Sequence, residues 1–290
     1  MGIELLYIAK MDLQASRVLY EKELYPQAIF YFQQSVEKAC KAFALLTNQV
    51  TEKELPREVG HETIRIFEMA TKHQVIRFKQ LEENLNKLPE LKTLAILKDF
   101  DIKKNLNEFE RSLSEIEEIK DDREDLIHIS SRDIRLILKE IKFTNKDLEK
   151  GKRSLSKFKI SERTWNKQKV EILEFCKVLL KNDSTQFEEI KSSFDKAETK
   201  LLVEKSIKDL LEPLTIALLI SVSLYYLAII TLPHSIIARY PLNGLTPVEI
   251  YTKELPVVKM LPKLLEIQDS VLKELETLNK NFEDRVVLPA

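Results

Sequence analysis

The segment Tyr25–Leu46 carries the clearest fold signal in this chain. Its sequence, YPQAIFYFQQSVEKACKAFALL, predicts one helix of about six turns. Apolar residues recur there at steps of three and four and would form one buried face: Ile29, Phe32, Val36, Ala39, Cys40 and Phe43. A compact polar set lies beside that face: Gln33, Gln34, Glu37, Lys38 and Lys41. A helix with one apolar face must bury it against other elements, so this segment predicts a helical bundle.

The composition extends this prediction to the whole chain. Only 4 of the 290 residues are Gly and 32% are charged, and many Leu, Lys and Glu residues with few Gly are typical of helical proteins. We therefore expect an all-α fold. Lys and Arg number 46 against 47 for Asp and Glu, which leaves a formal net charge of -1. The overall charge thus gives no electrostatic indication of nucleic-acid binding.

Targeting and redox features predict a cytoplasmic protein. Two cysteines, Cys40 and Cys176, are too few for a disulfide framework, and the first residues do not form a signal-peptide pattern. The apolar segment 214–233, LTIALLISVSLYYLAIITLP, is long enough to cross a membrane. We expect it to be the buried central helix of a bundle, with a membrane-associated helix as the alternative.

Apolar periodicity and breaks divide the chain into three parts. Helices are predicted at 3–23, 25–46 and from His61 onward, then at 75–88, 90–120, 123–149, 161–181 and 184–210, and finally at 213–232, near 247–254 and at 256–282. The stretch 76–205 is charge-dense, with narrow apolar stripes. We predict a bundle formed by residues 1–75 and 206–290, interrupted by an inserted set of long charged helices at 76–205.

Four places in the sequence resemble the HEPN family. They are the run Ala9–Leu13, the segment QQSVEKACKA from Gln33 to Ala42, His61 at a helix start, and Arg239-Tyr240-Pro241 after an apolar helix. The resemblance implies an up-and-down bundle of four or five helices that usually dimerises. It also implies nucleotide binding, metal-independent RNA cleavage through an Arg-x4-6-His motif, or partnership with nucleotidyltransferases in toxin–antitoxin or phage-defence systems.

One literal Arg-x4-His motif is present, Arg123 to His128. His128 could accept the 2′-hydroxyl proton of RNA or protonate the leaving oxygen, and Arg123 could stabilise the charged phosphorane. The alternative is a chance match, because the motif is short, lies in the predicted insertion and has acidic neighbours: Asp121, Asp122, Glu124 and Asp125.

Arg239 and Tyr240 are the second candidate pair, and they lie where the resemblance implies a catalytic or binding pair. Arg239 could hold a phosphate with its forked guanidinium, and Tyr240 could donate a proton or stack on a base. His234, five residues earlier, is a further candidate ligand contact. The alternative is structural: Arg239 paired with Glu37 inside the bundle, and Tyr240 packed as a core aromatic.

Glu37, Lys38 and Lys41, with His61, form a third candidate set that could line a nucleotide pocket. They could equally form a solvated or dimer-facing strip. The sequence HETIR at 61–65 lacks the second histidine of a zinc protease motif. Since the sequence also shows no Gly-rich phosphate loop and no Cys/His cluster, we expect neither a cofactor nor a metal.

These features favour a HEPN-like effector that binds nucleotide or RNA, in a defence or toxin–antitoxin setting, with metal-independent RNA cleavage as its enzymatic form. We expect a homodimer, and a protein partner could bind through 76–205. The alternative is a non-enzymatic interaction or scaffold protein that dimerises through the bundle.

Overall fold

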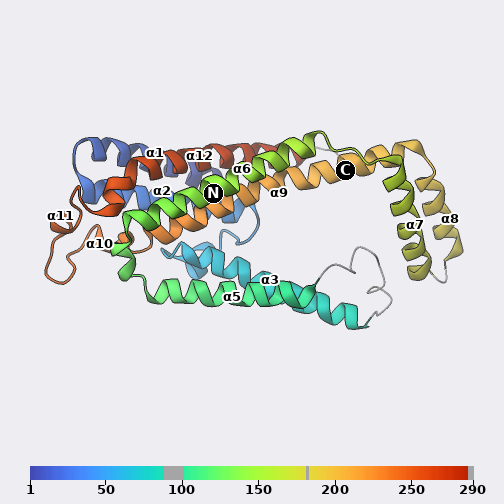
Figure 1. The fold of residues 1–290 in the computed structure, drawn as a ribbon, viewed down its shortest axis with the longest axis horizontal. Helices are drawn as coiled ribbons and strands as arrows, with labels where there is room; N and C mark the ends of the chain where they lie inside the picture. The colour runs from blue at the N-terminus through green and yellow to red at the C-terminus, as the bar shows by residue number, and fades with distance from the viewer. Residues whose placement is uncertain (88–100, 181–182, 287–290) are drawn as a thin grey trace. The chain divides into compact units, whose positions relative to one another are not determined.

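The protein is helical throughout the part that its computed structural model describes, residues 1–87, 101–180 and 183–286 (Figure 1). No β-strand occurs in those ranges, which confirms the predicted all-α class. The longer helices are α1 (Gly2–Glu21), α2 (Tyr25–Leu46), α3 (Ile64–Lys87), α5 (Ile102–Asp121), α6 (Ser131–Ser156), α7 (Glu162–Leu179), α8 (Ser184–Phe194), α9 (Ala197–Thr231) and α12 (Pro256–Val286). Four short ones connect them: η1 (Leu55–Val59), η3 (Asp125–His128), α10 (His234–Ile237) and α11 (Pro247–Ile250).

The chain forms two compact units, each assembled from separate stretches of sequence. Unit 1 consists of Met1–Gln74, Phe109–Leu148 and Ile216–Ala290. Unit 2 consists of Val75–Glu108 and Glu149–Thr215. The predicted division into 1–75, 76–205 and 206–290 stays a prediction, but residues 109–148 cluster with unit 1.

Helices α1 and α2 form an antiparallel hairpin at the start of unit 1 (Figure 1). Glu23 has a φ of 60° and reverses the chain, and the Leu24 amide donates to the Leu19 carbonyl at 2.9 Å. Pro26 lies in the first turn of α2, where a missing amide hydrogen costs nothing. Across the hairpin, the buried Ser16 hydroxyl donates to the Ala28 carbonyl at 2.7 Å.

Helix α12 packs against both α1 and α2 and closes this part of unit 1 (Figure 1). The buried side chains of α2 include several alanines, which allow neighbouring helices to approach closely: Ala28, Ala39, Ala42 and Ala44. A buried polar contact fixes the register of α12 on α2, because Gln268 Nε2 donates to Ser35 Oγ at 3.1 Å. The predicted apolar face of α2 is confirmed, since every residue assigned to it is buried.

The C-terminal half of α9 supplies a large share of the unit 1 core. Ile216, Ile220, Leu224 and Leu227 are at most 1% exposed and lie at helical spacing on one face, whereas Leu218 is 48% exposed. Residues 198–231 form one helix long and apolar enough to cross a membrane, and 56% of its most apolar window is buried. The cytoplasmic location stays a prediction.

Several predicted helix boundaries are wrong. Helix α3 runs through the boundary predicted at 75, and α6 covers Ser131–Ser156 where a helix at 123–149 was predicted. The chain breaks at Asp195 and Lys196, inside the predicted helix 184–210, and α9 then continues through Pro213. Pro213 removes only one helical hydrogen bond, the one to the Asp209 carbonyl, and Asp209 is exposed and can be solvated. The first part of the predicted helix 90–120 lies outside the described residues.

Unit 2 contains the pair α7 and α8, which lie side by side (Figure 1). Trp165 of α7 stacks on Phe194 of α8 with ring centroids 5.7 Å apart. The first turns of α9 are tied to the start of α7, because Glu204 accepts from the Ile160 amide at 2.7 Å and Lys200 pairs with Glu162 at 2.6 Å.

We expect the Phe32→Ala variant to lower the free energy of unfolding by about 3–5 kcal/mol, because a fully buried ring is replaced by a cavity. The matched control is Phe143→Ala, whose ring is 61% exposed and which should change stability by less than about 0.5 kcal/mol. Chemical denaturation followed by circular dichroism measures both, and equal losses would contradict the assigned core.

Candidate functional site

The candidate site is centred on Glu37, a buried carboxylate in the middle of α2. Its side chain is only 4% exposed. One oxygen, Oε1, lies 2.7 Å from Lys41 Nζ and 3.2 Å from His61 Nδ1. The other, Oε2, accepts from the side-chain amides of Gln33 at 3.1 Å and Gln34 at 3.3 Å. The polar strip of α2 is therefore a connected network around a single carboxylate.

These contacts keep Glu37 ionised. Burial alone raises the pKa of a carboxyl group, but the hydrogen bonds from Lys41, Gln33 and His61 outweigh it, so the pKa of Glu37 lies below its ordinary value of 4.5. Lys41 is 14% exposed and neutralises the charge directly. A buried carboxylate with several donors is held in one orientation, as required of a group that positions another side chain.

Lys38 belongs to an adjoining contact with α1. Its Nζ lies 2.7 Å from Asp12 Oδ2 and donates to Gln34 Oε1 at 2.9 Å. Both ionic partners are mostly covered, with 20% and 14% of their side chains exposed. Lys38 thus ties the α1–α2 hairpin together and has less freedom to reach a ligand than the sequence suggests.

His61 lies at the open edge of the Glu37 network. Its side chain is 89% exposed, and the Glu37 carboxylate engages Nδ1 only. A carboxylate accepts at Nδ1 and thereby fixes the ring, which leaves Nε2 directed away from it. The structure therefore brings Glu37 and His61 together, as the predicted pocket requires, although His61 precedes α3 rather than starting it.

Glu62 connects His61 to the Arg-x4-His motif. Its carboxylate binds Arg65 Nε at 2.6 Å and lies 3.8 Å from Arg123 Nη1. All these groups belong to unit 1. Arg123 therefore lies beside Glu62, the residue that follows His61.

His128 ends the short helix η3, five residues after Arg123. The intervening backbone is tightly turned, with hydrogen bonds from the Asp125 amide to the Asp122 carbonyl and from the Ile127 amide to the Glu124 carbonyl, at 3.0 and 3.2 Å. Ile127 is buried and anchors the turn, whereas His128 is exposed. The motif thus presents a half-buried arginine and an exposed imidazole from one anchored turn.

Arg239 and Tyr240 are both exposed, and Arg239 lies beside Phe30 in the N-terminal half of α2. The Arg239 guanidinium lies 5.2 Å from the ring centroids of Phe30 and Tyr240, and its Nε donates to the Ser235 carbonyl at 3.0 Å. No ion pair joins Arg239 to Glu37 in the described part of the chain. Phe30 precedes Glu37 by two helical turns on the same face, a rise of about 10 Å, so Arg239 and His61 flank one face of α2.

His234 is placed apart from Arg239, although only five residues separate them. It is fully buried, and its Nδ1 lies 2.8 Å from the Tyr251 hydroxyl. Burial lowers the pKa of His234 from 6.5 to about 3 and raises the pKa of Tyr251. A neutral imidazole inside the core contacts a ligand only if that part of the core opens.

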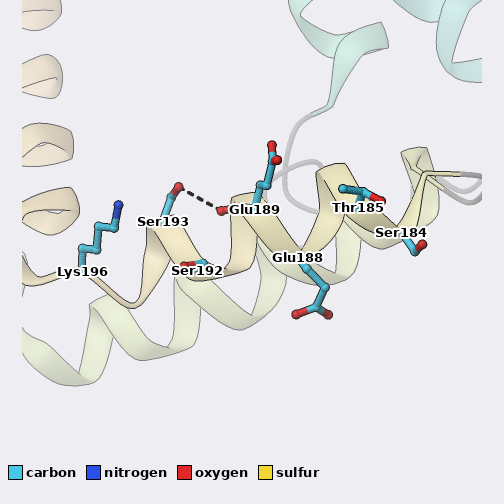
Figure 2. Close-up of a pocket in the computed structure, with 7 residues that line it drawn as sticks. All are labelled: Ser184, Thr185, Glu188, Glu189, Ser192, Ser193 and Lys196. Atoms are coloured by element: carbon cyan, nitrogen blue, oxygen red, sulfur yellow. Dashed lines mark hydrogen bonds between the residues drawn. The ribbon is translucent and has the colours of Figure 1, made fainter.

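Other parts of the described chain add no competing site of this kind. Within residues 1–87, 101–180 and 183–286, no group of three or more His, Cys, Asp or Glu side chains could hold a metal ion. A shallow hollow on unit 2 is lined by side chains of α8 and by Lys196, two residues after its end (Figure 2). Its one internal hydrogen bond, from Ser193 Oγ to the Glu189 carbonyl at 3.0 Å, is an ordinary helix contact.

Comparison with known proteins finds a family resemblance in the first part of the chain. The model of the HEPN domain matches residues 4–127, a range that starts in α1, includes α2 and ends one residue before His128. Residues 4–127 are thus similar to the HEPN domain family. The suspected relationship is thus confirmed, and it connects the chain to nucleotide- and RNA-related functions. No curated protein and no solved structure matches the chain.

The HEPN match covers Glu37 with His61 and also the start of the Arg123 motif. It does not reach Arg239, Tyr240 or His234. Sequence reasoning did not select Glu62 and Arg65, although Glu62 directly follows His61 and its pairing with Arg123 brings the two groups together. The functional roles of all these residues stay predictions.

We expect the free energy of unfolding to decrease as the pH is lowered, partly because His234 is buried in its neutral form. Its folded-state pKa of about 3 lies below the unfolded value of 6.5, so the unfolded chain binds a proton that the folded chain rejects. The contribution of His234 is fully present above pH 6.5. It declines by up to about 1.4 kcal/mol per pH unit as the pH falls from 6.5 toward 3.

Unfolding free energies measured between pH 7 and 5 test this expectation. The His234→Asn variant should show a shallower decline than the wild type, because the group that titrates is gone. The control His73→Asn changes an exposed histidine and shows the effect of a histidine substitution outside the core. If the unfolding free energy depends on pH equally in the wild type and in His234→Asn, His234 is not buried in neutral form.

Proposed function

We propose that this HEPN-like protein binds RNA at the edge of unit 1 formed by His61, Arg123 and His128, and cleaves it without a metal. The contact of Glu62 with Arg123 carries the proposal, because Arg123 of the Arg-x4-His motif lies beside the residue that follows His61, and His61 contacts Glu37. Three side chains suited to phosphodiester chemistry, two of them exposed, then come from neighbouring segments of one unit.

The proposed reaction is an internal transfer of the RNA phosphate. His128 takes the proton from the 2′-hydroxyl, the 2′ oxygen forms a bond to phosphorus, and the bond from phosphorus to the 5′ oxygen breaks. His61 returns a proton from Nε2 to the departing 5′ oxygen, while Glu37 holds the ring through Nδ1. Arg123 stabilises the extra negative charge on the phosphorane. The products are a 2′,3′-cyclic phosphate and a free 5′-hydroxyl.

We expect His128→Ala and Arg123→Ala to slow the cleavage of a fluorescent RNA oligonucleotide at least about 100-fold in the presence of EDTA, because each removes a group that acts in the transition state. The controls His73→Ala and Arg17→Ala remove exposed side chains of the same types elsewhere in the chain. They should keep the wild-type rate, and a 2′-deoxy substrate should not be cut.

A substrate with a p-nitrophenolate leaving group separates the two histidines. This leaving group needs no proton, so His61→Ala should regain most of the wild-type rate on uridine 3′-(p-nitrophenyl phosphate), whereas His128→Ala should not. Cleavage by His128→Ala at the wild-type rate would contradict the proposal.

The same variant, His128→Ala, tests the proposed defence or toxin–antitoxin role, since only the wild type should slow the growth of bacterial cells that express it.

The alternative function, an interaction protein that dimerises through unit 1, is favoured by the outer face of α1. Ile3, Tyr7, Met11 and Val18 are each 51–64% exposed and recur at steps of four and seven. An exposed apolar stripe with this spacing suits helix packing against a second copy. Dimerisation is also compatible with the RNA-cleaving function, so we propose a homodimer in both cases.

We expect the Tyr7→Lys/Met11→Lys variant to shift the protein from dimer to monomer, because two charges would then lie in the apolar stripe. Light scattering coupled to size-exclusion chromatography gives the mass directly. The control Lys22→Glu changes an exposed charge just after α1 and should stay dimeric. A wild type that is monomeric at all concentrations would exclude this role for the stripe.

A further inference from the structure

A second pocket lies within unit 1 between α6, α9 and α12. It has a volume of about 660 Å³, which falls in the range of small-molecule sites. Its lining shares no residue with the site around Glu37 and Arg123. All the helical segments that form it belong to unit 1. The pocket is therefore a feature of one compact body, separate from the residues proposed to act on RNA.

The pocket contains buried polar atoms that have no partner. Ser223 is fully buried in α9 and its Oγ makes no hydrogen bond, and the same holds for the buried Oδ1 of Asn145 on α6. Thr215 and Thr231, on the same α9 helix, instead donate to the carbonyl four residues earlier, both at 2.8 Å. Because buried polar groups are normally hydrogen-bonded, Ser223 and Asn145 indicate a missing partner inside the pocket.

Cationic side chains surround the same pocket. Arg135, Lys139 and Lys142 follow one another on α6 at steps of four and three, and Lys263 faces them from α12. None of the four forms an ion pair within the described residues, and the lining contains a single carboxylate, Glu266. In a chain with a formal net charge of -1, this is a local excess of three positive charges.

Apart from Ser270, the remaining walls of the pocket are apolar. They are formed by Leu138 and Ile141 of α6, Leu219 of α9, and Ile267 and Val271 of α12. A pocket with apolar walls, a few inward polar groups and a charged surround is the usual arrangement of a small-molecule site. Each of the three features restricts the chemistry of the ligand in a different way.

We propose that this pocket binds a small organic anion, whose phosphate or carboxylate lies on Arg135, Lys139, Lys142 and Lys263 and whose body enters between the helices. The body is apolar on its faces and carries hydrogen-bonding groups on one edge, where Ser223 and Asn145 meet it. A heterocycle has such an edge, whereas an unbranched hydrocarbon chain would leave both polar atoms unpaired. The pocket therefore favours a heterocyclic body over a hydrocarbon chain.

Isothermal titration calorimetry of the full-length protein tests the proposal with AMP, ATP, octanoate and inorganic phosphate as probes. A nucleoside phosphate should bind more tightly than inorganic phosphate, because the body adds contacts in the pocket. It should also bind more tightly than octanoate. Octanoate as the tightest probe would assign the site to a carboxylate on a hydrocarbon chain and overturn the role given to Ser223 and Asn145.

Variants then locate the binding. The Lys139→Gln/Lys142→Gln variant should raise the Kd of the tightest probe about tenfold, because two charge-assisted contacts are lost. Its matched control is Lys146→Gln, which removes an exposed lysine of α6 that does not line the pocket. Ser223→Ala should weaken binding of the nucleoside phosphate and leave the Kd of octanoate unchanged. Circular dichroism checks that all variants remain helical.

Three results would overturn the proposal: no probe binding with a Kd below about 1 mM, an unchanged Kd in Lys139→Gln/Lys142→Gln, or an equal loss in Lys146→Gln. RNA cleavage is measured separately on the same variants. Loss of anion binding with unchanged cleavage would support the pocket as an independent site. If Lys139→Gln/Lys142→Gln loses both anion binding and RNA cleavage while Lys146→Gln keeps them, these lysines belong to the RNA surface instead.

Discussion

The ionised state of Glu37 is the constraint on which the site depends. A carboxylate that is 4% exposed remains charged only if donors surround it, and Lys41, Gln33, Gln34 and His61 supply them. Three of these donors come from α2 itself, so the network is formed largely by one helix. The fourth, His61, comes from the segment before α3 and is thereby held on the face of α2. Among the described residues the Glu37 carboxylate is the side-chain partner of the His61 ring, so loss of its charge would weaken the hold on the ring.

The rest of unit 1 serves to bury α2. Helices α1, α12 and α9 contribute apolar side chains to the same core, and polar contacts set their register: Lys38 with Asp12, and Gln268 with Ser35. These pairings are specific, because a shift of one residue would leave a buried polar group unpaired. The core thus fixes α2, and α2 in turn fixes the carboxylate. Stability and site geometry are linked through a single helix.

Periodicity and composition were sufficient to predict the all-α class, the bounds of α2 and its buried face, because these depend on local spacing of apolar residues. The meeting of Arg123 with Glu62 could not be predicted in this way, since it depends on how residues 109–148 fold back onto unit 1. Charge density suggested a separate insertion there, yet Ile127, Ile134 and Ile141 are buried. The course of α9 through Pro213 was missed for a related reason: one lost hydrogen bond is small compared with the packing along the helix. The burial of His234 was likewise not visible from its neighbours.

Unit 1 consists of separate stretches of sequence, so its helices become available for packing at different times during translation. Helix α12 begins about 210 residues after α2 ends, so at 5–20 residues per second the ribosome needs roughly 10–40 s to deliver it. During that time the surfaces of α1 and α2 that α12 covers lack this partner. A nascent hairpin with an uncovered apolar face is a natural substrate for chaperones and for association with a second nascent chain. Packing of α12 on α1 and α2 therefore starts only after α12 has left the ribosome.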